Sequence, residues 1–283
     1  MLQPVLEQQP IIPHPPPTPA RDEAVFSFIF TGATWVTLFF YVAFVASLVI
    51  VDICYIKPGD FFGIFHDVDL LYAMRLSLVT STVSVILALL VALPVGYALS
   101  RFKFPGRVII DTLVDMPIVL PPLVIGVSLL VLFETPLGKA IENTGLRFVY
   151  TPLGIVLAQF TVVSAYAIRT IKTAFDSIDP RLENVARTLG WSRGQAFWRV
   201  TVPMARKGII AAGVIAWAHA IGLFGPLMVF SGTTRRKTEV LATSVYLELS
   251  VGEIEKALAI TLLLVILSMV SLILFKRLMG GKT

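Results

Sequence analysis

Six apolar segments, each long enough to cross a lipid bilayer, constrain this chain more than any other feature. A helix needs about 20 mostly apolar residues to cross the hydrocarbon core. Composition agrees, because 56% of the 283 residues are hydrophobic and only 14% are charged. We therefore expect an all-α integral membrane protein with six transmembrane helices. The predicted spans are Phe28–Val51, Leu76–Ser100, Thr112–Phe133, Pro152–Thr173, Gly208–Phe230 and Ala257–Phe275.

The distribution of Lys and Arg predicts the orientation of these spans. With six spans both termini share one side, and that side then holds most of the 23 basic residues, including those of the loop between the fourth and fifth spans. Basic residues favour the cytoplasmic side, so we expect both termini in the cytoplasm. Because the net charge is only +5, no nucleic-acid partner is expected. The triplet Arg235–Lys237 is an exception on the outer side, where it could guide an anion, dock an acidic partner or form a solvated turn.

The remaining segments limit the chemistry. Residues 1–27 form a Pro-rich tail that we expect to be extended and cytoplasmic, and residues 28–280 form the transmembrane domain. The single cysteine, Cys54, excludes an intrachain disulfide and a cysteine metal cluster. Neither a catalytic triad nor paired carboxylates occur within the spans, so we expect no catalytic residue, no metal and no cofactor.

The segment of about 175–207 is the one long loop on the cytoplasmic side, and it carries helix signals. Asp179 and Pro180 predict a helix start. Leu182, Val185, Ala186 and Leu189 predict the apolar face of that helix, and Gly190 predicts its end. Ser192 and Gln195 form a capping-box pattern for a second helix, which we expect to stop at Pro203. The sequence therefore predicts two short helices that lie against the membrane and could dock a soluble partner.

This loop resembles the signature loop of binding-protein-dependent ABC importer permeases. The family pattern is Glu-Ala-Ala, three residues, Gly, nine residues, Ile-x-Leu-Pro. Ala186, Gly190 and Pro203 match it in register, whereas Asn184 and Val185 replace the Glu and the first Ala. Glu183 keeps a carboxylate one residue earlier.

The resemblance implies the type I ABC importer permease fold, with coupling helices that contact an ATP-binding subunit. The residues implied in this contact are Glu183, Asn184, Ala186, Arg187, Gly190 and Pro203. The chain has no P-loop motif, so ATP hydrolysis is expected on a separate chain. The implied partners are an ATP-binding subunit dimer, an extracytoplasmic solute-binding protein and a second permease subunit, most simply a homodimer, in a bacterial or archaeal membrane.

A second resemblance concerns the fifth span. His219–Gly225 is similar to the corresponding region of molybdate, tungstate and sulfate permeases, which carry Arg-x-x-Gly-Glu-Phe-Gly. Gly222, Phe224 and Gly225 match, whereas His219 and Leu223 replace the Arg and the Glu. The resemblance implies import of an oxyanion. Ferric iron, a polyamine or a phosphonate stays open as the solute, and a secondary transporter is the alternative class.

Several residues are candidates for the solute path. His219 is the one ionisable residue at mid-membrane in these spans, and polar residues at that depth are often functional. It could donate hydrogen bonds to an anion or bond a neighbouring helix. Gly222, Phe224 and Gly225 could form a gate or a close helix contact. Pro117, Pro121 and Pro122 are expected to break the third span, either at the path or as a structural kink.

Overall fold

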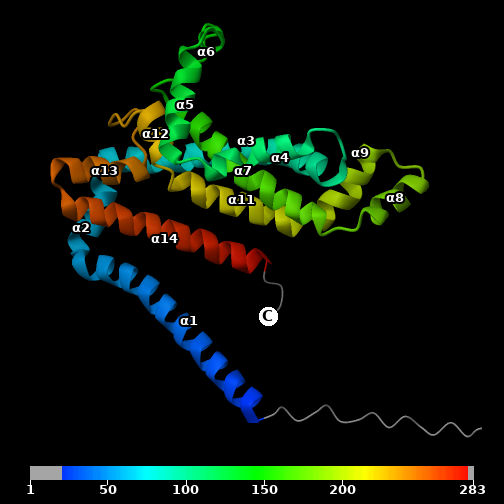
Figure 1. Ribbon diagram of the computed structural model, residues 1–283. Coiled ribbons are helices and arrows are strands. Elements are labelled where there is room, and N and C mark those ends of the chain that lie inside the picture. The colour runs from blue at the N-terminus through cyan, green and yellow to red at the C-terminus, as the bar shows by residue number, and fades with distance from the viewer. Residues whose placement is uncertain (1–20, 280–283) are drawn as a thin grey trace, which may run out of the picture. The chain divides into compact units, whose positions relative to one another are not determined.

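A computed structural model describes residues 21–279 of the chain, and all regular structure in that part is helical. The predicted Pro-rich tail therefore lies outside the described residues up to position 20. The first helix begins at Arg21, seven residues before the predicted start of the first span. Figure 1 shows the helices α1 (Arg21–Tyr55), α2 (Pro58–Gly63), η1 (Ile64–His66), α3 (Val68–Arg101), α4 (Arg107–Val119), α5 (Pro122–Glu134), α6 (Pro136–Glu142), α7 (Pro152–Asp176), α8 (Pro180–Thr188), α9 (Arg193–Ala196), η2 (Phe197–Thr201), α10 (Val202–Met204), α11 (Arg206–Ile221), α12 (Gly225–Phe230), α13 (Leu241–Val251) and α14 (Ile254–Met279).

The chain divides into two compact units, with the division after Val51. Within the described residues the first unit is the single helix α1 up to that point, and its large apolar side chains are exposed. The second unit contains all the other helices. Exposed apolar side chains along a helix of 35 residues suit a lipid environment, since no water-soluble fold would leave them uncovered.

Four of the described helices are long and apolar enough to cross a membrane. These are α1, α3, α7 and α14. Two further spans exist only if each bent pair of helices counts as one span. The chain bends by 112° between α4 and α5, and by 72° between the segments Arg193–Met204 and Arg206–Ile221. The protein is therefore an all-helical, multi-pass membrane protein.

Two of the predicted spans are not continuous helices. The predicted third span breaks at Pro121, as its prolines indicated, and α5 and α6 leave the helix bundle there (Figure 1). Pro117, in contrast, lies inside α4. The predicted fifth span ends at Ile221 and resumes in α12 after three non-helical residues. At 16 residues α11 is about 24 Å long, which is shorter than a bilayer core of about 30 Å.

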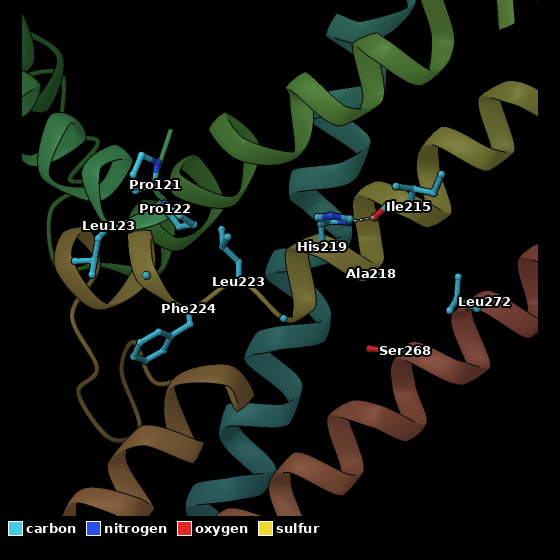
Figure 2. A pocket seen from close by; sticks show the side chains of 12 residues that line it. Pro121, Pro122, Leu123, Ile215, Ala218, His219, Leu223, Phe224, Ser268 and Leu272 are labelled. Atoms are coloured by element: carbon cyan, nitrogen blue, oxygen red, sulfur yellow. Dashed lines mark hydrogen bonds between the residues drawn. The ribbon is translucent and has the colours of Figure 1, made fainter. Parts of the chain in front are cut away.

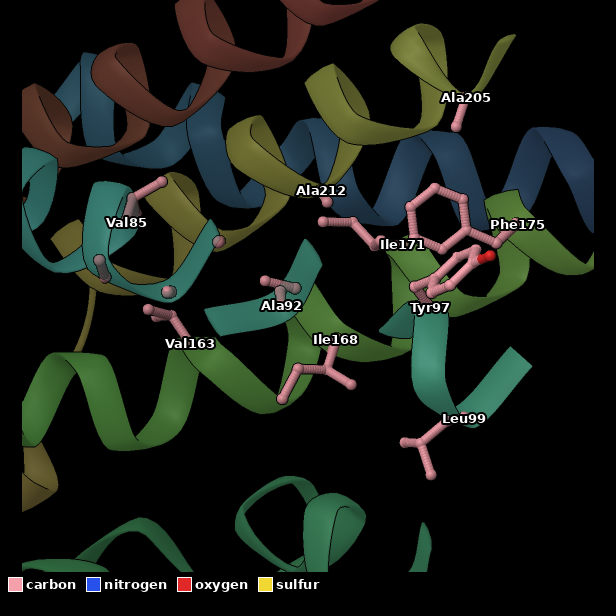
Figure 3. Close-up of a cluster of buried hydrophobic side chains, with 14 of the residues drawn as sticks. Val85, Ala92, Tyr97, Leu99, Val163, Ile168, Ile171, Phe175, Ala205 and Ala212 are labelled. Atoms are coloured by element: carbon pink, nitrogen blue, oxygen red, sulfur yellow. The ribbon is translucent and has the colours of Figure 1, made fainter. Parts of the chain in front are cut away.

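The largest core cluster lies between α3, α7 and α11 (Figure 3). Small side chains dominate it, which lets the helix backbones approach closely, as is common in membrane proteins. One end of this cluster is aromatic and contains Tyr97 and Phe175. Its fully buried alanines are Ala88, Ala92, Ala167, Ala216 and Ala220.

Two glycines mark close contacts of α7 with α3 and α11. A Cβ on Gly96 of α3 would lie 3.1 Å from the Ile171 side chain of α7. A Cβ on Gly208 of α11 would lie only 2.3 Å from the Cβ of Ala174, also on α7. Because real Cβ atoms do not approach so closely, α11 can begin against α7 only with glycine at this position.

Candidate functional site

A cavity of about 820 Å³ lies where the two broken segments of the chain face α14 (Figure 2). One wall is the end of α11 with the non-helical residues that follow it. A second wall is the break between α4 and α5, and a third is α14. Its lining residues are Pro121, Pro122, Leu123, Ile215, Ala218, His219, Gly222, Leu223, Phe224, Gly225, Ser268 and Leu272. All six residues that the sequence predicted for the solute path therefore line one cavity.

His219 supplies the only ionisable side chain among these lining residues. Its Nδ1 lies 3.0 Å from the carbonyl oxygen of Ile215, one turn earlier in α11 (Figure 2). Because a carbonyl only accepts, Nδ1 carries the proton, and the other ring nitrogen, Nε2, is an acceptor in the neutral ring. The ring also stacks on Tyr166 of α7, with 4.2 Å between ring centroids. His219 therefore bonds its own helix rather than a neighbouring one.

The three predicted residues around the α11–α12 break have different surroundings. A Cβ on Gly225 would lie 3.2 Å from both the backbone of Leu123 and the side chain of Pro122, so Gly225 fits α12 closely against the start of α5. A Cβ on Gly222 would meet nothing closer than 3.7 Å. Phe224 packs on Tyr246 of α13, with 5.7 Å between ring centroids.

The break between α4 and α5 removes the helical hydrogen-bond donors of two backbone carbonyl groups in α4. Pro121 and Pro122 have no N–H, so the carbonyl groups of Pro117 and Ile118 cannot take their usual helical hydrogen bonds. At membrane depth such carbonyls are tolerated where they are covered by protein or line a water-filled space. The cavity itself is lined mainly by apolar side chains, with the His219 imidazole and the Ser268 hydroxyl as its polar side chains.

The loop after α7 forms the predicted pair of short helices. The Asp179 side chain caps α8 by accepting from the N–H of Arg181, at 2.9 Å. Gly190 follows the helix with a φ of +91°, and the N–H of Trp191 donates to the carbonyl of Ala186. Only glycine adopts this left-handed conformation readily. The capping box of Ser192 and Gln195 is also present.

The second helix of this loop ends one residue after the predicted stop at Pro203. The segment α9–η2–α10 continues through Pro203 to Met204, and its chain direction changes at Ala205. A π-helical turn, η2, precedes the proline. Because a π turn shifts the hydrogen-bond register by one residue, the helix can include Pro203 in its last turn.

The buried face of α8 differs from the one that the apolar pattern indicated. Glu183 and Ala186 are buried, whereas Leu182, Val185 and Leu189 are exposed, Leu189 at 76%. Asn184, Arg187, Gly190 and Pro203 are exposed as well. Of the predicted contact residues, these four are accessible to another protein, and Glu183 and Ala186 face the chain itself.

Glu183 binds the end of α3. Its Oε1 accepts from Nε of Arg101 at 2.8 Å and its Oε2 accepts from the Tyr97 hydroxyl at 2.8 Å. Burial tends to raise the pKa of Glu183, but the hydrogen bonds from Arg101 and Tyr97 outweigh it and hold the pKa below the ordinary value of a glutamate.

The opposite end of α3 carries a second charge cluster. Arg235 donates to Oε1 of Glu248 at 2.7 Å, and both Arg235 and Arg236 pair with Asp69 at the start of α3. Two of the three bases in the predicted triplet are thus neutralised by carboxylates. The neighbouring Glu239 is 1% exposed, and burial raises the pKa of its carboxyl.

A third charged contact joins α4 to α7. Arg169 pairs with Asp115 at 2.9 Å and lies 3.6 Å from Asp111. Among residues 21–279, no group of three or more His, Cys, Asp or Glu side chains is placed to hold a metal ion.

Sequence reasoning missed several residues with specific contacts. Tyr97 and Arg101 bind Glu183, and their partner lies more than 80 positions away, so no local pattern could reveal the contact. Gln159 is buried in mid-helix and joins three helices. A lone amide within an apolar span was the available signal for Gln159.

Comparisons with known proteins agree on one family. Residues 84–280 match the family described as "Binding-protein-dependent transport system inner membrane component". The molybdate/tungstate transport system permease protein WtpB of Thermococcus kodakarensis is 37% identical over 58% of this chain and 62% of its own length. This chain thus spans about three fifths of that relative. The molybdenum transport system permease protein ModB of Escherichia coli is 31% identical over 71% of this chain and 90% of its own length.

The fold also occurs in a solved transporter. The crystal structure of a bacterial alginate ABC transporter, in complex with alginate pentasaccharide-bound periplasmic protein, contains a chain that superposes with a TM-score of 0.66. That match has 19% sequence identity and covers 93% of this chain and 97% of the other. The family match over residues 84–280 agrees with the two bent helix pairs and with the loop that turns at Gly190. This chain therefore belongs to the binding-protein-dependent transport system inner membrane component family.

Proposed function

We propose that this chain is the membrane-spanning subunit of an ATP-driven importer, in which it forms the path of an oxyanion such as molybdate, tungstate or sulfate. ATP hydrolysis takes place on a separate ATP-binding subunit, and an extracytoplasmic binding protein delivers the solute. Both termini and the loop of α8 and α9 lie in the cytoplasm, where the ATP-binding subunit is.

The loop after α7 carries this proposal. Its Gly190 corner holds two capped helices at a fixed angle, and Leu182, Val185 and Leu189 are exposed beside Arg187. Exposed apolar side chains next to an arginine, at the end of a bundle of membrane-spanning helices, suit docking into an apolar cleft with an acidic rim. Asn184, Gly190 and Pro203 complete this docking surface.

The names of the relatives support an oxyanion as the solute. WtpB and ModB are permeases of molybdate/tungstate and molybdenum transport systems. The cavity lined by His219, Pro121 and Pro122 is the section of the path that this chain contributes. A second copy of the chain completes the path, since six helical segments form only one side of such a passage.

His219 sets the pH dependence of uptake in this proposal. The neutral ring uses its N–H on Ile215 and presents only an acceptor to the cavity, so it cannot donate to an oxyanion. Protonation makes Nε2 a donor. Tyr166 is the titratable side chain in contact with the ring, and Ser268 and Leu272 of α14 across the cavity carry no charge. We expect uptake to fall as the pH rises from 5.5 to 8.

The test is uptake into proteoliposomes that contain the ATP-binding subunit and the binding protein. Tungstate, sulfate, ferric iron, a polyamine and a phosphonate are compared as solutes. His219→Arg should keep uptake constant across the pH range, and His219→Ala should lower it at pH 5.5. His66→Ala is the matched control, because His66 makes the same bond to a carbonyl four residues earlier but lies outside the cavity. An identical pH profile for wild type and His219→Ala contradicts the role of His219, and uptake without ATP contradicts the importer.

Cysteine labelling tests the orientation. In a Cys54→Ser background, cysteines at Ser192 and Lys237 occupy exposed positions in the α8–α9 loop and in the segment before α13. A membrane-impermeant reagent applied to intact cells should label position 237 and spare position 192. Labelling of both from the same side excludes the proposed topology.

A further inference from the structure

One helix, α3, is joined by buried hydrogen bonds to the loop that contains α8, α9 and η2. This loop is called the docking loop below. Both carboxylate oxygens of Glu183 on α8 are used, one by Arg101 and one by Tyr97. The side chains of Arg101 and Glu183 are only 9% and 8% exposed. Arg101 also donates to the carbonyl of Ile178 at 2.9 Å, so it holds the segment before α8 as well. A planar guanidinium bonded to both Glu183 and Ile178 allows little relative movement between α3 and α8.

The second helix of the loop is attached to the same part of α3. The Tyr97 ring packs edge-on against Phe197 of η2, with 4.7 Å between centroids, and against Phe175 of α7 at 6.0 Å. The Arg193 guanidinium lies 5.2 Å from the Phe102 ring centroid. Both helices of the docking loop are therefore fixed to the last turns of α3.

A second buried joint connects the middle of α3 to the cavity. Gln159 of α7 donates to the carbonyl of Ala220 at 3.0 Å and to the Ser81 hydroxyl at 3.2 Å, and it accepts from Ser84 at 3.1 Å. These four residues are at most 1% exposed. Ala220 directly follows His219 at the end of α11. One amide thus ties α3 to the helix end that lines the cavity.

The stretch of α3 between the two joints is continuous helix. About 13 residues, or about 20 Å, separate Ser84 from Tyr97. Pro94 lies within this stretch without ending the helix. Gly96 brings α3 against α7 in the next turn, so the two helices support each other along this length.

We propose that Tyr97, Arg101 and Glu183 are positioning residues that make the docking loop move together with α3, and that Gln159 transmits this movement to the end of α11 at the cavity. This role rests on the proposed importer function. It assigns Glu183 to force transmission within the chain, since its oxygens are buried and unavailable to the ATP-binding subunit.

The test measures how many ATP molecules are hydrolysed per solute imported, in the full complex with its binding protein. Glu183→Gln and Tyr97→Phe keep the size of each side chain and weaken the hydrogen bonds between Glu183 and the end of α3. Gln159→Leu removes the hydrogen bonds that connect α7 to α3 and to the end of α11. We expect all three to co-purify with the ATP-binding subunit in wild-type amount and to raise the ATP-to-solute ratio about fivefold or more, within the range of typical coupling between sites.

Two control variants and one charge exchange distinguish force transmission from other roles. Thr80→Val changes a buried polar residue of α3 whose hydroxyl bonds only its own helix, so its ratio should stay at the wild-type value. Leu189→Ser changes the exposed docking surface and should reduce co-purification. The exchange Arg101→Glu with Glu183→Arg restores the ion pair but not the hydrogen bonds of Tyr97 and Ile178, so its ratio should lie below that of Glu183→Arg alone and above that of wild type.

The outcomes separate this inference from the function on which it rests. A wild-type complex that imports no solute with ATP overturns both. A working wild-type complex whose Glu183→Gln, Tyr97→Phe and Gln159→Leu variants keep the wild-type ratio overturns the transmission role alone. Loss of co-purification in Glu183→Gln would instead make Glu183 a docking residue and also overturn the inference.

Discussion

Two buried glutamates, one near each end of α3, have opposite electrostatic surroundings. Glu183 receives hydrogen bonds from Arg101 and Tyr97, and its pKa is held below the ordinary value. Glu239 is buried at least as deeply, but only Ser244 donates to it, and its Oε2 has no hydrogen-bond partner among residues 21–279. Burial raises the pKa of Glu239. The donors around a buried carboxylate, rather than its depth, thus decide which protonation state the fold favours.

The largest expected effect comes from removing the well-paired carboxylate. Glu183→Ala leaves the Arg101 charge buried without its partner, which typically destabilises a protein by about 3–5 kcal/mol. We expect a pronounced fall in the thermal unfolding midpoint in detergent. Glu239→Ala serves as the comparison, and an equal fall in both variants would contradict the contrast between the two sites.

A smaller effect is expected from removing one donor. Tyr97→Phe keeps the aromatic packing on Phe197 and leaves one oxygen of Glu183 without its hydrogen bond. An unsatisfied buried acceptor costs about 1–3 kcal/mol. The unfolding midpoint should lie between those of wild type and Glu183→Ala. Tyr246→Phe, at an exposed tyrosine, should leave it unchanged.

The pH dependence of stability should distinguish the two glutamates. The stabilisation from Glu183 is present above the unfolded pKa of about 4.3 and is lost only as the pH falls through its lower folded pKa, so it is constant from pH 5.5 to 8. For Glu239 the folded pKa is raised. The stabilisation of the protein by the neutral carboxyl group is therefore fully present below about pH 4.3, and it is lost as the pH rises through the folded pKa.

Glu239→Gln keeps the shape of the side chain and removes this titration. We expect its unfolding midpoint to exceed that of wild type at pH 8 by about 2–4 °C for each kcal/mol gained, and to approach the wild-type value near pH 4.5. A difference that is the same at both pH values would show that the substitution acts through packing or amide hydrogen bonds rather than through ionisation.

The smallest effect is expected at Ser231, close in sequence to Glu239. Its hydroxyl is buried and has no hydrogen-bond partner among the described residues. Replacing an unpaired buried hydroxyl by a methyl-sized group removes a desolvation penalty, so Ser231→Ala should be neutral or stabilise the protein by less than about 1 kcal/mol. Ser84→Ala is the control. Because Ser84 donates a hydrogen bond to Gln159, this variant should be less stable than the wild-type protein.

Local signals in the sequence predicted the two short helices α8 and α9 well. Asp179, Gly190, Ser192 and Gln195 act on their own backbone within a few residues, so their caps form as the pattern indicates. The buried face of α8 could not be predicted in the same way. Periodicity identifies the apolar stripe, but the ion pair of Glu183 with a distant residue decides which side of the helix faces the protein.

Hydropathy likewise found the apolar segments but not their bends. Pro121 and Pro122 correctly indicated the break before α5. The break before α12 was less visible because an isolated glycine such as Gly222 costs a helix only about 1 kcal/mol. The signal there is the dipeptide Gly225–Pro226, since the residue before a proline disfavours helix. The shared cavity of the two breaks depends on tertiary packing and could be inferred only through family resemblance.

The contact of Gly208 with Ala174 gives α11 the geometry of a lever. The two backbones meet where no side chain fits, so the start of α11 is a fixed pivot on α7. His219 lies 11 residues further along, which places it about 16 Å from the pivot, and a tilt of about 5° would displace it by about 1.4 Å. That displacement is about the radius of a water molecule. Under the proposed function, a rotation of this size would alter the width of the cavity beside His219.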